Sequence, residues 1–225
     1  MIENIKIFGE RNSGTIFLNQ LLLKNLFNFG LLSCKPEETG SGWKHGFPDM
    51  ERFSEKDKEE ILFIFIIRDL ESWLMSMYNN PYHFEEPKTI EDFISNKLET
   101  SDSCPIGEEV SAGQGRCVMS LRYAKIKSYL KSFGEAKNAI MVNLEDLQND
   151  NSKFLYFLKN NYDLNMRLPH KRVGYHTKNR YRSASTSGGW NRKYKVVLPE
   201  KVVASKRDES LERLVNRLKK TYYYK

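Results

Sequence analysis

Three short runs of hydrophobic residues interrupt an otherwise polar chain and predict β-strands at 5–8, 61–67 and 139–143. Residues 61–67 are apolar at every position, the pattern of a strand buried on both faces of a parallel sheet. Helical spacing of hydrophobic residues predicts helices over 15–29, 70–78, 118–133, 152–162 and 210–222. This alternation predicts an α/β fold of one domain over residues 1–225, with a central parallel sheet flanked by helices.

A loop bounded by two glycines follows the first predicted strand. Gly9 and Gly14 frame this loop, and Thr15 begins the next predicted helix. Backbone N–H groups at a helix start, together with the positive end of the helix dipole, bind phosphate or sulfate. The glycine spacing is that of the Walker A pattern G-x-x-x-x-G-K-[ST], but Thr15 stands where the phosphate-binding lysine belongs. We therefore predict an anion site and disfavour an ordinary ATPase or GTPase.

A second group that can bind an anion follows the run 61–67. Arg68 comes directly after this run, and Ser76 lies eight residues further along, in the next predicted helix. A cation at the carboxyl end of a strand and a hydroxyl about two helical turns later can converge on one anion. The alternative is that Arg68 pairs with Asp69 or Glu71.

These segments resemble motifs of sulfotransferases that use 3′-phosphoadenosine-5′-phosphosulfate (PAPS). Residues 12–17, N-S-G-T-I-F, resemble the K-S-G-T-T-W of the family's 5′-phosphosulfate loop, and residues 68–76 resemble its 3′-phosphate motif, R-x-P-x-x-x-x-x-S. Residues 43–48 are similar to the family's K-x-H-x-P segment, 143–147 to its R-Y-E-D-L, and 188–191 to its G-D-W-K loop. The resemblance implies a fold like that of P-loop nucleotide hydrolases, with PAPS as donor and adenosine 3′,5′-bisphosphate (PAP) as product.

The resemblance also implies which residues surround the nucleotide. They are Arg11, Asn12, Ser13, Gly14, Thr15, Ile16, Arg68, Ser76, Tyr123, Arg182, Gly188, Gly189 and Trp190. Tyr123 stands where the family has an aromatic residue near adenine, and its alternative role is core packing. Asn12 replaces the lysine that stabilises the oxygen bridging phosphate and sulfate, and Arg11 precedes it. Whether Arg11 takes over that role stays open.

Sulfuryl transfer to a hydroxyl or amine needs one base and several groups that stabilise negative charge. His45 is the first candidate for the base, because an unperturbed imidazole titrates near neutral pH. Glu10 is the alternative. Lys44 and Arg11 are candidates for stabilising the transferring group. We expect the reaction to require no metal.

The excess positive charge is concentrated in one segment. The chain has 36 Lys and Arg against 29 Asp and Glu, a net charge of +7. Residues 164–199 contain nine of these bases and no acid, which leaves 27 bases and 29 acids elsewhere. We interpret 164–199 as a basic lid over the nucleotide, with a solvated loop or an RNA-binding segment as alternatives. Residues 79–117, which are rich in acids, are the predicted gate for the acceptor.

The acceptor itself is not identified by the sequence. The acidic gate favours a neutral carbohydrate, a small alcohol or a peptide hydroxyl over a heavily sulfated polysaccharide. Two other function classes remain: a P-loop nucleoside or nucleotide kinase that uses ATP and Mg²⁺, and a non-catalytic basic RNA-binding module. Our preferred interpretation expects no nucleic-acid partner and leaves the oligomeric state open.

Cysteine content and hydropathy bear on the compartment. Cys34, Cys104 and Cys117 are too few and too scattered for a disulfide framework or a zinc site, which favours a reducing compartment. No stretch is long and apolar enough to be a transmembrane segment. The first predicted strand begins at residue 5 and leaves no room before it for a signal peptide. We therefore expect a cytoplasmic protein.

Overall fold

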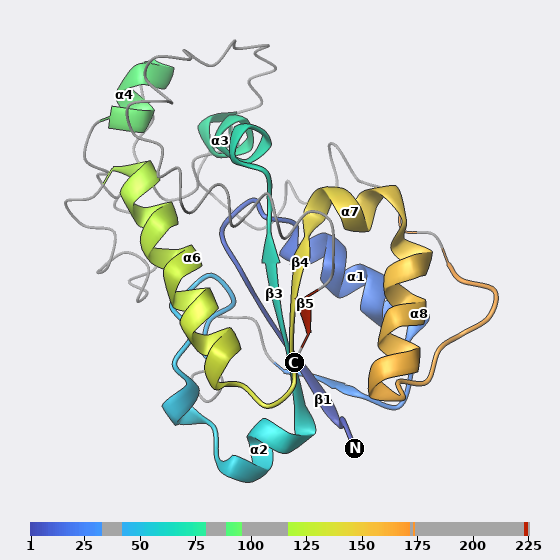
Figure 1. Ribbon diagram of the computed structural model, residues 1–225. Helices are drawn as coiled ribbons and strands as arrows, with labels where there is room; N and C mark the ends of the chain where they lie inside the picture. Colours follow the sequence, from blue (N-terminus) through green and yellow to red (C-terminus); the bar gives the residue numbers. More distant parts are fainter. Residues whose placement is uncertain (33–41, 80–88, 96–116, 172, 174–222, 225) are drawn as a thin grey trace, which may run out of the picture.

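The computed structural model describes residues 1–32, 42–79, 89–95, 117–171, 173 and 223–224 (Figure 1). Its sheet has the order β2-β1-β3-β4-β5. The strands are β1 (Asn4–Gly9), β2 (Gly30–Leu31), β3 (Ile61–Ile67), β4 (Ala139–Asn143) and β5 (Tyr223–Tyr224). The first four strands in this order are parallel to their neighbours, and β5 is antiparallel to β4. The predicted α/β class with a parallel central sheet is therefore confirmed.

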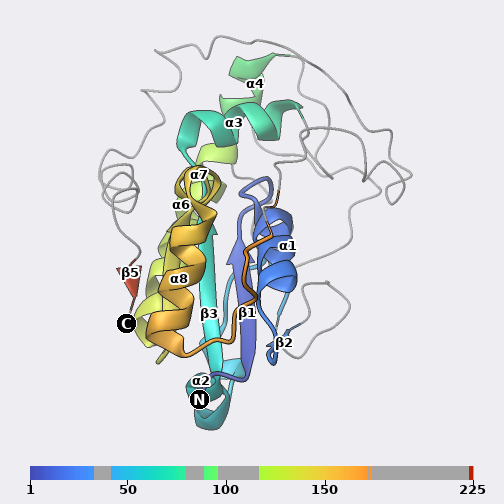
Figure 2. The ribbon, with the colours of Figure 1, turned by 90° about the vertical axis from the view of Figure 1, so that its right-hand side faces the viewer.

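Helices lie on both faces of the sheet and at its carboxyl edge, and α2 lies at the amino end of β3. They are α1 (Thr15–Asn25), α2 (Glu55–Glu60), α3 (Leu70–Asn79), α4 (Ile90–Ser95), α6 (Val118–Glu135), α7 (Leu144–Asn149) and α8 (Asn151–Tyr162), with a 3₁₀ turn at Met50–Arg52. Figure 2 looks onto the face covered by α1 and α8, and α6 covers the opposite face. In the described part of the chain, every helix is too short or too polar to cross a membrane.

The core explains why β3 is apolar at every position. All seven of its residues are buried. Because side chains alternate across a strand, Leu62, Ile64 and Ile66 join the cluster under α1 and α8. Phe63 and Phe65 join the cluster under α6. The central strand is thus covered by a hydrophobic layer on each face.

A third hydrophobic cluster lies beyond the carboxyl ends of the strands. Trp73 and Met77 of α3 pack there with Phe93 of α4 and Val118 of α6. Figure 1 shows α3 and α4 above the end of β3. This cluster holds α3 over the edge of the sheet where the loops after β1 and β3 meet the start of α7.

The element boundaries differ from the predictions in a few places. The helix predicted over 15–29 ends at Asn25, since Leu26 is extended and Asn28 has a left-handed backbone with φ 58°. Helices α2, α4 and α7 and the two-residue strands were not predicted, because segments of two to six residues carry little periodic signal. The predicted helix 210–222 lies outside the described residues. So do most of the predicted gate 79–117 and all of the lid beyond residue 173.

Candidate functional site

The loop between β1 and α1 has the backbone geometry expected of an anion site. Asn12 and Gly14 have positive φ angles of 60° and 93°, and Gly14 is the N-cap of α1 without a side-chain cap. The first turn of α1 carries no acidic residue. Among the described residues, nothing accepts a hydrogen bond from the backbone N–H groups of Gly14, Thr15 or Ile16. These N–H groups and the helix dipole are therefore available to an anion.

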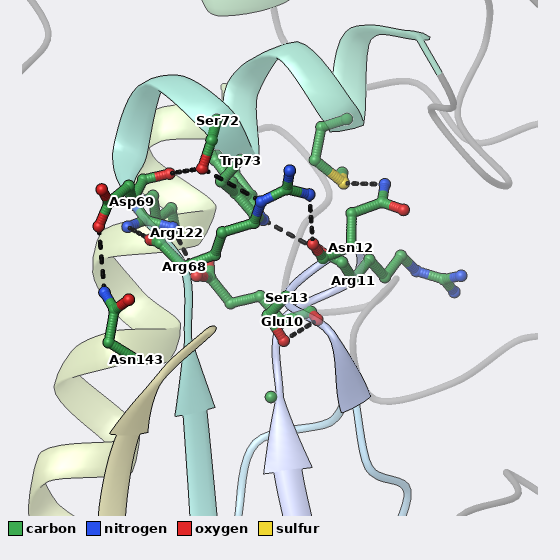
Figure 3. Close-up of polar contacts among 12 residues, drawn as sticks. Glu10, Arg11, Asn12, Ser13, Arg68, Asp69, Ser72, Trp73, Arg122 and Asn143 are labelled. Atoms are coloured by element: carbon green, nitrogen blue, oxygen red, sulfur yellow. Dashed lines mark hydrogen bonds and ion pairs between the residues drawn. The ribbon is translucent and has the colours of Figure 1, made fainter. Parts of the chain in front are cut away.

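Three consecutive loop carbonyls accept hydrogen bonds from Ser13 in the loop, from Trp73 of α3 and from Arg68 after β3 (Figure 3). The Glu10 carbonyl accepts from Ser13 N at 3.1 Å and from Ser13 Oγ at 2.7 Å. The Arg11 carbonyl accepts from Trp73 Nε1 at 2.9 Å, and the Asn12 carbonyl accepts from Arg68 Nη1 at 3.0 Å. These donors offset the partial negative charge of the three carbonyl oxygens. Repulsion of an anion bound at the loop would therefore be weaker.

Both glycines of the loop are sites of close packing. A Cβ atom on Gly9 would lie 2.5 Å from Ile66 Cγ2 and 2.6 Å from Ser13 Oγ. A Cβ atom on Gly14 would collide with Leu144 at the start of α7. The glycine spacing that predicted an anion loop from sequence is thus required by contacts with β3 and α7.

Gly14→Ala is expected to lower the free energy of unfolding by roughly 2–4 kcal/mol. The φ of 93° is unfavourable for a residue with a side chain, and the new methyl group overlaps Leu144. Urea denaturation measures the change. The matched control is Gly134→Ala in α6, where a Cβ meets nothing within 4 Å, so it should be neutral or slightly stabilising. Equal losses in both variants would contradict the strained loop geometry.

Arg68 lies between the loop after β1 and the first turn of α3. Its Nη1 donates to the Asn12 carbonyl, and its Nε donates to Ser72 Oγ at 3.1 Å. Its Nε also lies 3.7 Å from Oε1 of Glu145, so Arg68 forms an ion pair with an acid that is distant in sequence. The guanidinium group therefore lies beside the glycine-bounded loop after β1.

Ser76 flanks the same loop from α3 without contacting Arg68. The Ser76 carbonyl accepts a hydrogen bond from Asn12 Nδ2 at 3.5 Å, and Asn12 Nδ2 also lies 3.1 Å from Met77 Sδ. The Asn12 carbonyl thus accepts a hydrogen bond from Arg68, and the Asn12 side chain donates one to the turn of α3 that carries Ser76. The structure brings the two predicted anion-binding segments to one place.

Glu145 is a site residue that the sequence analysis did not identify. Its carboxylate accepts from Ser72 Oγ at 2.6 Å and from the Asp69 N–H at 3.2 Å, which caps the N-terminus of α3. Asn143, at the end of β4, accepts from the Glu145 N–H at 2.8 Å and donates to Asp69 Oδ1 at 3.0 Å. These bonds fix the start of α3 to the end of β4 and the start of α7, and they orient Arg68.

His45 lies half-buried beside the end of β1. Its Nδ1 is 2.7 Å from the Gly9 carbonyl, and the Gly9 N–H donates to the Lys44 carbonyl at 2.9 Å. Because a carbonyl oxygen only accepts hydrogen bonds, Nδ1 carries the proton, and in the neutral ring Nε2 carries the lone pair. Burial, followed by the charges of Lys44 and Arg11, lowers the pKa of His45 well below 6.5. His45 is therefore neutral at pH 7.

Arg11 and Asn12 direct their side chains to different sides of the loop (Figure 3). The Arg11 guanidinium lies 4.7 Å from the centre of the Trp43 ring, and that ring meets the His45 ring edge-on with centres 5.3 Å apart. Asn12 instead reaches Met77 of α3. The cationic side chain of the loop is thus on the His45 side.

Glu10, the alternative base, is buried in an ion pair. It is 1% exposed, and its Oε2 lies 2.6 Å from Nη1 of Arg122, which is also 1% exposed. Arg122 is a second site residue that was not identified from sequence. Its position on the face of α6 that also carries the apolar Val118, Ile126 and Tyr129 was the available signal. Tyr123 lies on the exposed side of α6, where Lys127 is 6.0 Å from its ring centre.

No family model, curated protein or solved structure matches the chain. The described residues contain no group of three or more His, Cys, Asp or Glu side chains placed to hold a metal ion. The predicted lid residues Arg182, Gly188, Gly189 and Trp190 lie outside the described residues.

Proposed function

We propose that this protein is a sulfotransferase with a P-loop-like fold, which transfers a sulfuryl group from PAPS to a hydroxyl or amine. The observation that carries the proposal is the hydrogen bond from His45 Nδ1 to the carbonyl of Gly9, the first residue of the anion loop. The bond leaves Nε2 as the basic nitrogen, while burial and the charges of Lys44 and Arg11 lower the pKa of His45 and keep its imidazole neutral. This imidazole lies next to a glycine-bounded loop that lacks the Walker lysine. Without that lysine the loop fits poorly with transfer from a metal-bound triphosphate, whereas a nearby base fits transfer of a sulfuryl group to a hydroxyl or amine.

The anion loop and Arg68 would each bind one of the two charged ends of the donor. The N–H groups of Gly14, Thr15 and Ile16 would bind the 5′-phosphosulfate at the start of α1. Arg68 would bind the 3′-phosphate together with the turn that carries Ser76. The contact of Arg68 with the Asn12 carbonyl supports this division, because it puts a cation at the border of the loop.

The chemical step follows from the charges on the His45 side. His45 Nε2 would take the proton from the acceptor as its oxygen or nitrogen attacks sulfur, and the bond from sulfur to the phosphate oxygen would break with PAP as leaving group. Arg11 and Lys44 would stabilise the charge on the sulfuryl and bridging oxygens. In this proposal the transfer requires no metal.

The geometry favours His45 over Glu10 as the base. Glu10 is buried, and its charge is balanced by Arg122 at 2.6 Å. A carboxylate in such an ion pair is a poor proton acceptor, because the neighbouring cation stabilises its ionised form. The acceptor stays a prediction, with a carbohydrate, a small alcohol and a peptide hydroxyl as candidates. The cytoplasmic localisation also stays a prediction.

Ligand-dependent thermal stability tests the proposal against its two rivals. PAP should raise the melting temperature at concentrations where ATP with Mg²⁺ and single-stranded RNA have little effect, since a ligand that binds only the folded state stabilises it. Stabilisation by ATP with Mg²⁺ alone would favour the kinase, and stabilisation by RNA alone would favour the RNA-binding module. Either result would contradict the sulfotransferase proposal.

A further inference from the structure

Arg122 of α6 contacts both loops that carry the proposed phosphate-binding groups. Its Nη1 lies 2.6 Å from Glu10 Oε2, in the loop after β1. Its Nη2 donates to the Arg68 carbonyl, after β3, at 2.8 Å. One planar guanidinium group therefore joins two segments that are 58 residues apart in sequence.

A stacked indole extends this connection to the next residue of the anion loop. The Arg122 guanidinium lies 4.7 Å from the centre of the Trp73 ring, and Trp73 Nε1 donates to the Arg11 carbonyl. Both side chains are buried. Arg122 and Trp73 therefore hold a fixed position, which is set by packing as well as by hydrogen bonds.

We propose that Arg122 is a positioning residue that fixes the separation of the anion loop and Arg68, and so makes the site selective for ligands with two phosphate groups. The inference rests on the proposed function. Arg122 does not touch the ligand in this account. It acts through the carboxylate of Glu10, through the Arg68 carbonyl, and through Trp73, which donates to the Arg11 carbonyl.

The strand ladder alone does not hold the two loops. Pairing of β1 with β3 ends at Gly9 with Ile66, so Glu10 and Arg68 lie beyond the last paired residues. A buried charge-assisted contact at this position keeps the two loops at one separation. Lysine cannot replace the arginine, because it lacks the planar fork that donates to two acceptors at once.

The test compares a bisphosphate with its two monophosphates. Calorimetric titrations of wild type and Arg122→Lys would use PAP, adenosine 5′-phosphate and adenosine 3′-phosphate. Each monophosphate needs only one of the two loops, so its Kd should change less than about 3-fold. The Kd for PAP should rise about 10-fold or more, because both loops must be engaged together. Lys127→Arg, on the exposed side of the same helix, should change none of the three values.

A second variant covers the case in which Arg122→Lys does not fold. Glu10→Gln weakens the same contact from the other side and should show the same loss of selectivity for PAP, to a smaller extent. Equal weakening of all three ligands, or an unchanged PAP affinity in a folded variant, would overturn the positioning role. Failure of the wild type to bind PAP would instead overturn the proposed function, so the two failures are distinguishable.

Discussion

His45→Asn is expected to lower kcat for sulfuryl transfer by about 10²–10⁴-fold, the usual effect of removing a general base. The asparagine amide can still donate to the Gly9 carbonyl in place of Nδ1, but it has no basic nitrogen in place of Nε2. The loop geometry is kept, so the Kd for PAP should stay within about 3-fold of the wild-type value. Steady-state kinetics and calorimetry measure the two quantities separately.

The pH dependence of the wild type provides a second signature of the same base. Because burial and the charges of Lys44 and Arg11 lower the pKa of His45 well below 6.5, kcat/KM should not fall between pH 7 and 6.5. It should fall tenfold per pH unit only below the lowered pKa, where the free enzyme binds the proton. This acidic limb should be absent from the residual activity of His45→Asn.

The same shift predicts the direction of the stability change with pH. The unfolded chain takes up a proton on His45 near pH 6.5, whereas the folded protein takes it up only at lower pH. The free energy of unfolding should therefore fall as pH drops from about 6.5 toward the folded pKa, more steeply in wild type than in His45→Asn. An acidic limb of kcat/KM at or above pH 6.5, or full turnover in His45→Asn, would remove His45 from the mechanism.

Arg68→Met is expected to raise the Kd for PAP by roughly 10- to 100-fold, the loss of one or two hydrogen bonds to a charged group. Methionine also removes the donor to the Asn12 carbonyl and the ion pair with Glu145. Isothermal titration with PAP measures the effect.

The control for Arg68→Met is Arg52→Met. Arg52 is a half-exposed arginine paired with Asp49 at 3.2 Å, so its replacement removes the same net charge and one ion pair away from the site. PAP affinity in this control should be near that of wild type. Equal losses in the two variants would show that Arg68 contributes only to the overall charge, which would contradict its assignment to the 3′-phosphate.

The three main strands were predictable because their hydrophobic pattern is continuous and local. Residues 61–67 and 139–143 were placed at the observed boundaries of β3 and β4. The tight loop between β1 and α1 was also predictable, because two glycines between a strand and a helix favour a turn of this kind. Binding of an anion there stays a prediction. Arg68 was placed correctly at the end of β3, and the structure brings it against the loop.

The long-range contacts that hold the site residues in place could not be predicted from local patterns. Glu10 and Arg122 are 112 residues apart, and their ion pair depends on how α6 packs on the sheet. The hydrogen bond from Trp73 Nε1 to the Arg11 carbonyl could not be predicted either, because the helical pattern only indicates that the ring is buried in the core. Glu145 reaches the N-terminus of α3 from the first turn of α7, at a distance of 73 residues from Ser72. Contacts of this kind depend on tertiary packing, whereas strands follow local periodicity.

The most direct test of the proposed activity is a comparison of group transfer from two labelled donors. Wild-type protein would be incubated with ³⁵S-labelled PAPS or with γ-³²P-labelled ATP and Mg²⁺, each with the same neutral sugars, small alcohols and tyrosine-containing peptides. The proposal predicts ³⁵S transfer to an acceptor with one PAP formed for each group transferred, and transfer at least about 10²-fold slower by His45→Asn. Transfer of ³²P from ATP, with PAPS left intact, would contradict it.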